Sequence, residues 1–258
     1  MEDKTTDMQP DYRPLGCGEC ADGADLAFDL TMAFQPIVNT TTQQIFAHEA
    51  LVRGLNNEPA AQIFAQVNDG NRYRFDQVCR TKAIKLACEL AMPTLLNINF
   101  MPNAVYQPDL CIRTTLAAAD RYGFPIERIV FEITESEKVE DLLHLRRIVD
   151  YYRERGFKIA IDDFGAGYAG LKRLAEIPAD IVKLDMALIR QIDTDKVRQA
   201  IVRGIFQVCE ELSAQVIAEG VETSEELAVL QGLGIELFQG YYFARPAFQA
   251  LATLENVT

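Results

Sequence analysis

Residues 34–51 read FQPIVNTTTQQIFAHEAL, and this stretch decides the fold. Two apolar, β-type runs at residues 34–38 and 45–51 flank the polar residues 39–44. This connection is too short for a parallel crossover, which needs about a dozen residues or more. We therefore expect the two strands to pair antiparallel, as a hairpin.

Six further β-type runs follow the hairpin, and helical stretches such as residues 141–155 and 196–212 lie between most of them. The runs cover residues 95–100, 129–133, 158–162, 181–184, 216–219 and 237–241. Strands that alternate with helices predict βαβ units and a parallel sheet. Eight strands in about 225 residues predict an α/β fold, a TIM-like (β/α)₈ barrel whose first strand is antiparallel. An open doubly wound sheet is the alternative, but its phosphate-binding G-x-G-x-x-G is absent after the first strand.

The composition is that of a folded globular protein with an acidic N-terminal segment. The 258 residues are 49% hydrophobic and carry a net charge of −13, which is not typical of a disordered or low-complexity chain. Residues 1–30 hold eight acidic and two basic residues, with Gly and Pro interspersed. We expect residues 1–30 to form a flexible arm and residues 31–258 to form one folded domain.

The same sequence excludes several classes of function. No run of about 18 uncharged apolar residues exists, so we expect no membrane span, and a pI near 4.7 argues against binding to a nucleic-acid polymer. Charged residues follow Met1, so we expect no signal peptide and a cytoplasmic protein. We interpret the cysteine pair Cys17 and Cys20 as structurally neutral, with a half-site shared across a dimer as the alternative. His48 and His144 are interpreted as structural.

Polar residues stand at or just after the ends of the predicted strands. They are Glu49, Arg53, Asn99, Glu132, Asp162, Asp163, Lys183, Glu219 and Gln239. The site of a barrel enzyme lies at the C-terminal ends of its strands, so we expect these side chains to share one polar mouth. Asp163 can face the mouth beside Asp162 only if the strand ends there, and the following Phe164-Gly-Ala-Gly167 predicts that it does.

Taken singly, each of these residues has a plainer interpretation. A Glu at a strand end is usually a solvated loop acid. The Asp162-Asp163 pair could cap the next helix, and Lys183 could pair with Asp185 at the surface.

As a set, the residues predict a divalent metal site. Five carboxylates at one barrel mouth repel one another unless cations lie between them. Carboxylate oxygens with an Asn amide select Mg²⁺ or Mn²⁺ rather than zinc. Two divalent ions and Lys183 balance the five negative charges, and Arg53 leaves positive charge for an anionic substrate. Two metal ions suit in-line displacement at phosphorus, so the residues predict a metal-dependent phosphoryl hydrolase without identifying its substrate.

An ordered series of motifs resembles the EAL-domain cyclic di-GMP phosphodiesterases. The series is FQPIV at residues 34–38, EALVR at 49–53, NIN at 97–99, FEITE at 131–135, DDFGAGY at 162–168, VKLD at 182–185, AEGVE at 218–222 and QGYYFARP at 239–246. The resemblance covers about residues 31–250, and chance agreement at every motif is negligible. It implies an EAL phosphodiesterase domain at residues 31–258 and the same barrel with one antiparallel strand.

The resemblance also implies a specific reaction and site. These enzymes hydrolyse one phosphodiester of cyclic di-GMP to linear pGpG, with a water activated by two divalent cations, Mg²⁺ or Mn²⁺. By similarity, one metal is bound by Glu49, Asn99, Glu132 and Asp162, and the second by Asp162, Asp163 and Glu219. The implied catalytic set is Glu49, Lys183, Glu219 and Gln239, and the implied substrate contacts are Leu51, Arg53, Asp163 and Gln239. Within these sets, Lys183 is similar to the lysine that contacts the attacking water.

Glu135 is similar to a glutamate that anchors the loop after Asp162, and that loop commonly forms a homodimer contact. The loop departs from many members at Ala166, Ala169 and Gly170, none of which matches a metal ligand. A catalytically inactive cyclic di-GMP receptor and a protein-interaction module are the alternatives. Every matched site position is present, which favours the active enzyme.

Overall fold

The computed structural model describes residues 26–105, 107–135, 141–167 and 170–254. Most of the expected N-terminal arm, the Cys17 and Cys20 pair, and Ala169 lie outside the described residues. At the end of the expected arm, Leu26 and Phe28 pack against the core and Leu30 is part of it.

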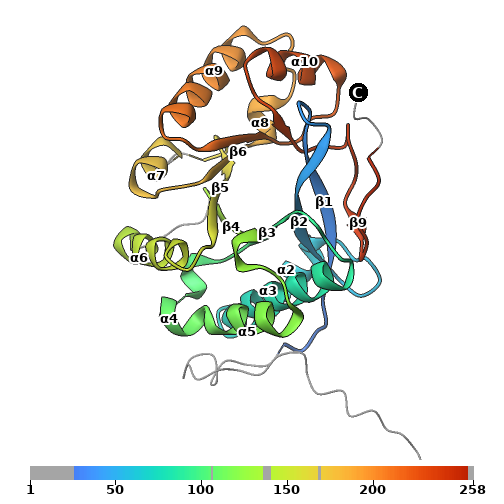
Figure 1. The fold of residues 1–258 in the computed structure, drawn as a ribbon, viewed down its shortest axis with the longest axis vertical. Coiled ribbons are helices and arrows are strands. Elements are labelled where there is room, and N and C mark those ends of the chain that lie inside the picture. Colours follow the sequence, from blue (N-terminus) through green and yellow to red (C-terminus); the bar gives the residue numbers. More distant parts are fainter. Residues whose placement is uncertain (1–25, 106, 136–140, 168–169, 255–258) are drawn as a thin grey trace, which may run out of the picture.

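Eight strands close into a barrel whose first strand is antiparallel to both of its neighbours in the ring (Figure 1). The strands are β1 (Thr31–Asn39), β2 (Gln44–Arg53), β3 (Leu95–Asn99), β4 (Ile129–Thr134), β5 (Lys158–Phe164), β6 (Ile181–Leu184), β7 (Gln215–Ala218) and β8 (Leu237–Phe238). Strands β2 to β8 pair in parallel in chain order, and β1 joins β8 to β2. The predicted barrel and its antiparallel first strand are confirmed.

One short strand was not predicted. Strand β9 (Ala247–Phe248) pairs with β1 at Ala33 and Phe34 and runs along the outside of the barrel (Figure 1). Two residues are too few to show the alternation by which a strand is recognised in a sequence.

Helices surround the ring (Figure 1). They are α2 (Ala60–Phe64), α3 (Arg72–Glu89), α4 (Pro108–Cys111), α5 (Arg113–Tyr122), α6 (Leu142–Arg153), α7 (Gly170–Glu176), α8 (Met186–Ile189), α9 (Lys196–Glu211) and α10 (Ser224–Gly232), with 3₁₀ turns η1 (Pro102–Ala104) and η2 (Ile126–Arg128). Side-chain caps fix several of their starts: Asp195 accepts hydrogen bonds from two backbone N–H groups of α9, and Thr223 and Glu226 form a capping box at α10. Among the described helices, none is both long and apolar enough to cross a membrane.

Three apolar clusters hold the layers together. One lies between the strands and α2–α6, and a second lies between the strands and α7–α10. The third fills the inside of the barrel and consists of Ile37, Ala47, Val130, Ala160, Ile181, Ile217 and Leu237. We call this third cluster the barrel floor. Because strand side chains alternate between faces, the next inward-facing position lies two residues away on each strand.

Candidate active site

A layer of polar side chains lies directly above the barrel floor. On β2 and β4 to β8, the residue two positions after each floor residue is a charged or amide residue. These residues are Glu49, Glu132, Asp162, Lys183, Glu219 and Gln239, and Asn97 on β3 and Gln35 on β1 face the same layer. The structure thus brings the predicted carboxylates, Lys183 and Gln239 into one polar mouth, whereas Arg53 is not part of this layer.

Lys183 lies at the centre of this layer. Its side chain is fully buried. Its Nζ lies 2.7 Å from Glu219 Oε1 and 2.9 Å from Glu132 Oε1. It also lies 3.0 Å from Asp162 Oδ1 and 3.2 Å from Glu49 Oε2. The alternative surface pair with Asp185 is not what the structure shows, because Asp185 instead caps α8 through Ala187 N.

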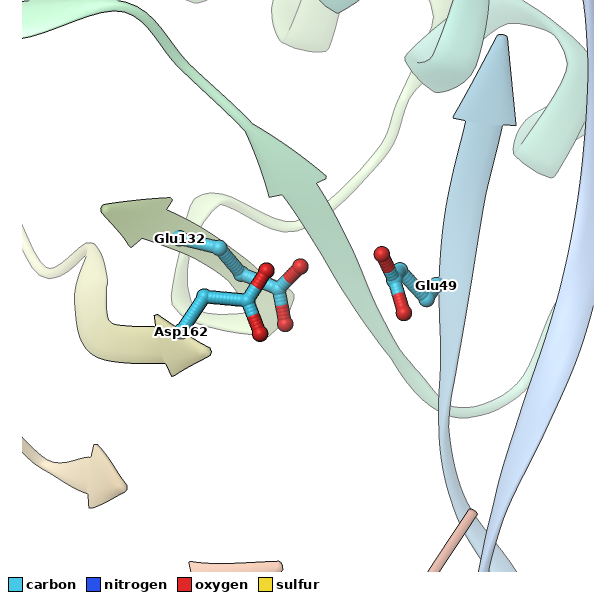
Figure 2. Close-up of side chains that lie close together, drawn as sticks. All are labelled: Glu49, Glu132 and Asp162. Atoms are coloured by element: carbon cyan, nitrogen blue, oxygen red, sulfur yellow. The ribbon is translucent and has the colours of Figure 1, made fainter. Parts of the chain in front are cut away.

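The carboxylates form two groups that share Asp162. Oxygens of Glu49, Glu132 and Asp162 lie within 4.8 Å of one another, and so do oxygens of Asp162, Asp163 and Glu219. Figure 2 shows the first group, with three carboxylates from β2, β4 and β5 directed toward one point. Two groups with one shared carboxylate are the arrangement expected for two neighbouring cations.

Asp163 reaches the mouth by a different route from the one predicted. The expected strand end at Asp162 was wrong, because β5 continues to Phe164. The pairing of β5 with β6 shifts between Ile161 and Phe164, and Asp163 has a left-handed φ of 53°. This irregularity re-aims successive side chains, so that Asp162 and Asp163 both face the mouth.

Amide side chains hold the carboxylates in place. Asn97 Nδ2 donates to Glu132 Oε1 at 2.7 Å, and Gln239 Nε2 donates to Glu49 Oε2 at 2.8 Å. Asn99 Nδ2 donates to Glu49 Oε1 at 3.0 Å. Turning the Asn99 amide over would instead present its oxygen to a cation.

Sequence reasoning gave no role to Asn97 or to Gln35. Asn97 is fully buried in the layer, and Gln35 Oε1 accepts a hydrogen bond from Gln239 Nε2 at 3.3 Å. Their spacing in the sequence could have revealed them. Gln35 lies two residues from Ile37, which belongs to the barrel floor, and Asn97 lies two residues from Leu95, which packs against the floor.

Burial raises the pKa of most carboxylates in the layer. Burial, assisted by repulsion from neighbouring carboxylates and opposed by the Lys183 ammonium, raises the pKa of Glu132 and of Glu219 well above the usual value. Burial and the adjacent Asp162 raise the pKa of Asp163 to about 6. Without further cations, these carboxyls therefore tend to keep their protons, because one lysine does not offset the cost of burying all of them as carboxylates.

Glu49 is the exception within the layer. Burial would raise its pKa, but the Lys183 ammonium and hydrogen bonds from Gln239 and Asn99 together lower it. Burial would lower the pKa of Lys183, but the surrounding carboxylates raise it well above the usual value. Glu49 and Lys183 thus form an ionised pair at the centre of the site.

The residues present fit divalent cations. The donor set is made of carboxylate and amide oxygens, which suit Mg²⁺, Mn²⁺ or Ca²⁺. Asp162 Oδ1 is buried and lies near Lys183 Nζ, yet it accepts no hydrogen bond of good geometry. A cation between the two carboxylate groups would satisfy this oxygen and offset the burial and the mutual repulsion that raise the pKa values of these carboxyls.

Glu135 lies beside the carboxylate groups and contacts the loop after β5. Its Oε2 accepts a hydrogen bond from Gly165 N at 2.7 Å, and its backbone N donates to Asp162 O at 2.9 Å. Gly165 has a φ of 99°, and a Cβ there would collide with Leu188 Cδ1, so this position requires glycine. The buried Glu135 carboxylate therefore holds the loop that begins at the two aspartates.

Two cavities open beside the polar layer. The larger, about 560 Å³, is lined by apolar residues such as Leu51, Phe64 and Phe75 and reaches Asn99 and both aspartates. The smaller, about 240 Å³, is lined by Glu49, Glu219, Gln239, Tyr241 and others. Arg53 lines neither cavity, and its Nη1 donates to Val52 O at 2.8 Å.

Comparison with known proteins gives a single family. The model of a family described as the EAL domain matches residues 26–246. The blue light- and temperature-regulated antirepressor BluF of Escherichia coli K12 is 32% identical over 245 residues, which cover 91% of this chain and 60% of that protein. The "Probable cyclic di-GMP phosphodiesterase PdeA" of the same organism is 35% identical over 150 residues, which cover 58% of this chain and 20% of that protein. The chain thus spans 60% or less of the length of these relatives.

Solved structures share the fold over most of the chain. A standalone versatile EAL protein from Vibrio cholerae O395, in its c-di-GMP-bound form, is 56% identical with a TM-score of 0.87 and covers 90% of this chain and 98% of its own. BlrP1 from Klebsiella pneumoniae, in a complex with manganese and cyclic di-GMP at pH 6, is 35% identical with a TM-score of 0.83. That match covers 87% of this chain and 57% of the BlrP1 chain.

Proposed function

The chain belongs to the EAL domain family, and from this premise we propose that it hydrolyses one phosphodiester bond of cyclic di-GMP to linear pGpG. The oxygen of a water forms a bond to phosphorus as the P–O3′ bond breaks, which leaves a 5′-phosphate and a 3′-hydroxyl. The name of PdeA and the nucleotide bound to the Vibrio cholerae protein support this substrate.

The observation that carries the proposal is the position of the polar layer between two cavities. A cyclic dinucleotide presents two bases on either side of a phosphodiester ring. The apolar cavity lined by Leu51 and Phe75 suits a base, because purines bind to apolar and aromatic side chains. A base there would bring a phosphodiester close to Asp162 and Asp163, which line the same cavity.

We propose that the layer binds two divalent cations, Mg²⁺ or Mn²⁺, as the manganese complex of BlrP1 suggests. Glu49, Asn99, Glu132 and Asp162 would hold one ion, and Asp162, Asp163 and Glu219 would hold the other. Such ions supply positive charge that lowers the pKa of an attacking water and stabilises the leaving oxygen.

The chain's own residues orient and hold these groups. Lys183 stays protonated, because the carboxylates around it raise its pKa, and its ammonium is the donor we assign to the attacking water. Gln239 fixes Glu49 through the hydrogen bond to Oε2. Leu51 faces the base cavity. Arg53 would contact a substrate phosphate only after its guanidinium leaves Val52 O.

The test is to incubate the protein with cyclic di-GMP in Mg²⁺, in Mn²⁺ and in EDTA, and to separate the products by chromatography. We expect pGpG in either cation and none in EDTA. Asp162→Asn is the control for contaminating nucleases, because Asp162 belongs to both carboxylate groups. Nucleotide that stays intact in both cations would contradict the proposal.

A protein-interaction module that does not hydrolyse cyclic di-GMP is the second candidate, because BluF is named an antirepressor. Calorimetry that shows no binding of cyclic di-GMP in either cation would favour it, whereas binding without product would favour an inactive receptor. We also propose a homodimer through the loop after β5 and the adjoining α7, where Leu171 is 62% exposed, and sedimentation tests it. A cytoplasmic location is likewise a proposal, and the free thiols of Cys79, Cys88, Cys111 and Cys209 suit a reducing compartment.

A further inference from the structure

A buried ion pair lies in the helix layer behind the carboxylate site. Arg80 and Asp76 belong to α3 and are 1% and 4% exposed. Arg80 Nη2 lies 2.6 Å from Asp76 Oδ2. Arg80 lines neither of the two cavities, whereas Asp76 borders the larger one.

Aromatic rings surround the Arg80 guanidinium. Its carbon lies 5.2 Å from the centroid of Phe100 and 5.1 Å from that of Phe131, within the range of cation–π contacts. Nη1 also donates to the Tyr152 hydroxyl of α6 at 3.4 Å. The Phe100 and Phe131 rings meet edge to face at 5.5 Å, so the guanidinium and the two rings form one packed unit.

Each of these two rings is the sequence neighbour of a proposed cation ligand. Phe100 follows Asn99, and Phe131 precedes Glu132. Phe131 and Glu132 are adjacent residues of β4 and point to opposite faces. Phe100 follows the last residue of β3 and belongs with Phe131 to the apolar cluster outside the barrel, so both rings lie behind the backbone that carries the two ligands. Phe100 N donates to Glu132 O at 3.1 Å, which joins the two backbones directly.

Asp76 extends the same unit past the end of β3. Its Oδ1 accepts a hydrogen bond from Met101 N at 3.0 Å. The segment after Asn99 is thus held at Phe100 by the guanidinium and at Met101 by the carboxylate that pairs with it. A shift of Arg80 would move both contacts together.

We propose that Arg80 is a positioning residue that sets the separation of Asn99 and Glu132 at the cation site. The inference rests on the proposed function only in taking these two residues as cation ligands. A buried ion pair is weak evidence for stability, because apolar residues of similar volume often stabilise a core as well or better. The planar guanidinium can stack on two rings while it pairs with a carboxylate, and a lysine ammonium cannot.

The test compares Arg80→Lys with Arg128→Lys. Arg128 shares two kinds of contact with Arg80, a hydrogen bond, here to Met92 O at 3.3 Å, and a cation–π contact, here with Phe124 at 5.5 Å. It lies just before the start of β4, away from the ligands. The measurements are the Kd of Mn²⁺ by calorimetry, kcat and KM for cyclic di-GMP, and the melting temperature.

For Arg80→Lys we expect Mn²⁺ to bind about 10- to 100-fold more weakly, the usual effect of removing a group that orients metal ligands. We expect kcat to fall with KM unchanged, because Arg80 touches no cavity. Arg128→Lys should keep the wild-type Kd and kcat. If Arg80→Lys melts lower but binds Mn²⁺ as wild type does, Arg80 is merely structural and the proposal is overturned.

A second variant keeps the proposal testable if Arg80→Lys does not fold. Asp76→Asn with Arg80→Met removes both buried charges and avoids an unpaired one, and the same loss of Mn²⁺ affinity is expected. The Kd of Mn²⁺, measured for wild type and for the variants, tests this proposal separately from the proposed phosphodiesterase activity. Wild-type protein that binds Mn²⁺ without forming pGpG contradicts the phosphodiesterase, and the two affinities still decide the role of Arg80. Wild-type protein that binds no Mn²⁺ overturns both.

Discussion

Two buried basic side chains, Lys183 inside the barrel and Arg80 in the helix layer outside it, have very different surroundings. Inside the barrel, Lys183 contacts four carboxylates, and Asp163 adds a fifth nearby. Outside the barrel, Arg80 pairs with Asp76 and packs on aromatic rings. The charges of Arg80 and Asp76 balance each other within the protein. The interior group has more carboxylates than Lys183 can neutralise, and this excess is the basis of the proposal that it binds further cations.

Among the changes that test this difference, replacement of Lys183 should have the largest effect on turnover. Lys183→Met removes the ammonium that contacts four carboxylates, and we expect turnover to fall about 10²- to 10³-fold, the range for loss of one positioned hydrogen-bond donor at the reacting atoms. The measurement is the initial rate of pGpG formation at saturating Mn²⁺. Lys158→Met, at the opposite end of β5, is the control, and a rate for Lys183→Met that matches it would remove Lys183 from the mechanism.

Loss of the loop anchor should have the next largest effect. Glu135→Ala removes the carboxylate that holds Gly165 N, and a displacement of about 1 Å in a catalytic group costs on the order of 10²-fold in rate. Circular dichroism should stay unchanged, and sedimentation should show a weaker dimer. The control is Glu127→Ala, at an exposed acid in η2. Wild-type turnover in Glu135→Ala would leave Glu135 as a structural residue.

Cations should stabilise the fold because of the interior charge excess. A ligand that binds only the native state adds about 2.7 kcal/mol at about 100 times its Kd, which raises the melting temperature by roughly 5–10 °C for a domain of this size. The comparison is thermal melting in Mn²⁺ and in EDTA. Asp162→Asn should lose most of the shift, since Asp162 serves both groups. Identical midpoints for wild type in the two buffers would mean that no cation site forms.

The smallest expected effect is the dependence on pH of the difference in melting temperature between Mn²⁺ and EDTA. The folded-state pKa of Asp163 is raised to about 6 by burial and by Asp162, and those of Glu132 and Glu219 are also raised by burial. These carboxyls bind protons more tightly in the folded than in the unfolded state. The stabilising contribution of Asp163 to the cation-free protein is therefore lost as pH rises through about 6, and those of Glu132 and Glu219 are lost as pH rises through their own raised pKa values.

Cations replace those protons, so the difference in melting temperature between Mn²⁺ and EDTA should widen by a few degrees from about pH 5.5 to about pH 8. A profile of melting temperature against pH in both buffers measures it. A constant difference would show that the carboxylates do not exchange protons for cations.

Much of the barrel and its mouth followed from the sequence because each depends on a local pattern. Alternating strands and helices predicted the barrel, and the short connection at residues 39–44 predicted the antiparallel β1. The apolar runs ended at the residues that now form the polar layer, because the floor and the layer differ by the strand period of two.

The remainder depended on tertiary structure. The left-handed φ that turns Asp163 toward Asp162 has no signature in the residues themselves. Asp76 and Arg80, four residues apart on a helix, have the spacing of an exposed ion pair, and only the packing of Phe100 and Phe131 against them places them in the core. Asn97 could have been assigned to the layer, since it lies two residues from Leu95, which packs against the floor.

The antiparallel β1 has a further consequence for how such a barrel is joined to other modules. Thr31 pairs with Arg53 at the mouth end of β2, and Gln249 Nε2 donates to Thr31 Oγ1 at 3.0 Å. Residues 31 and 249 thus lie side by side at this end of β1, whereas the chain after Gln249 runs on to Leu254, which packs with the apolar cluster beside α7–α10. A module joined ahead of Leu26 would therefore lie only a few residues from the rim of the site, and a rotation of that module would be transmitted to the mouth through Thr31 and Arg53.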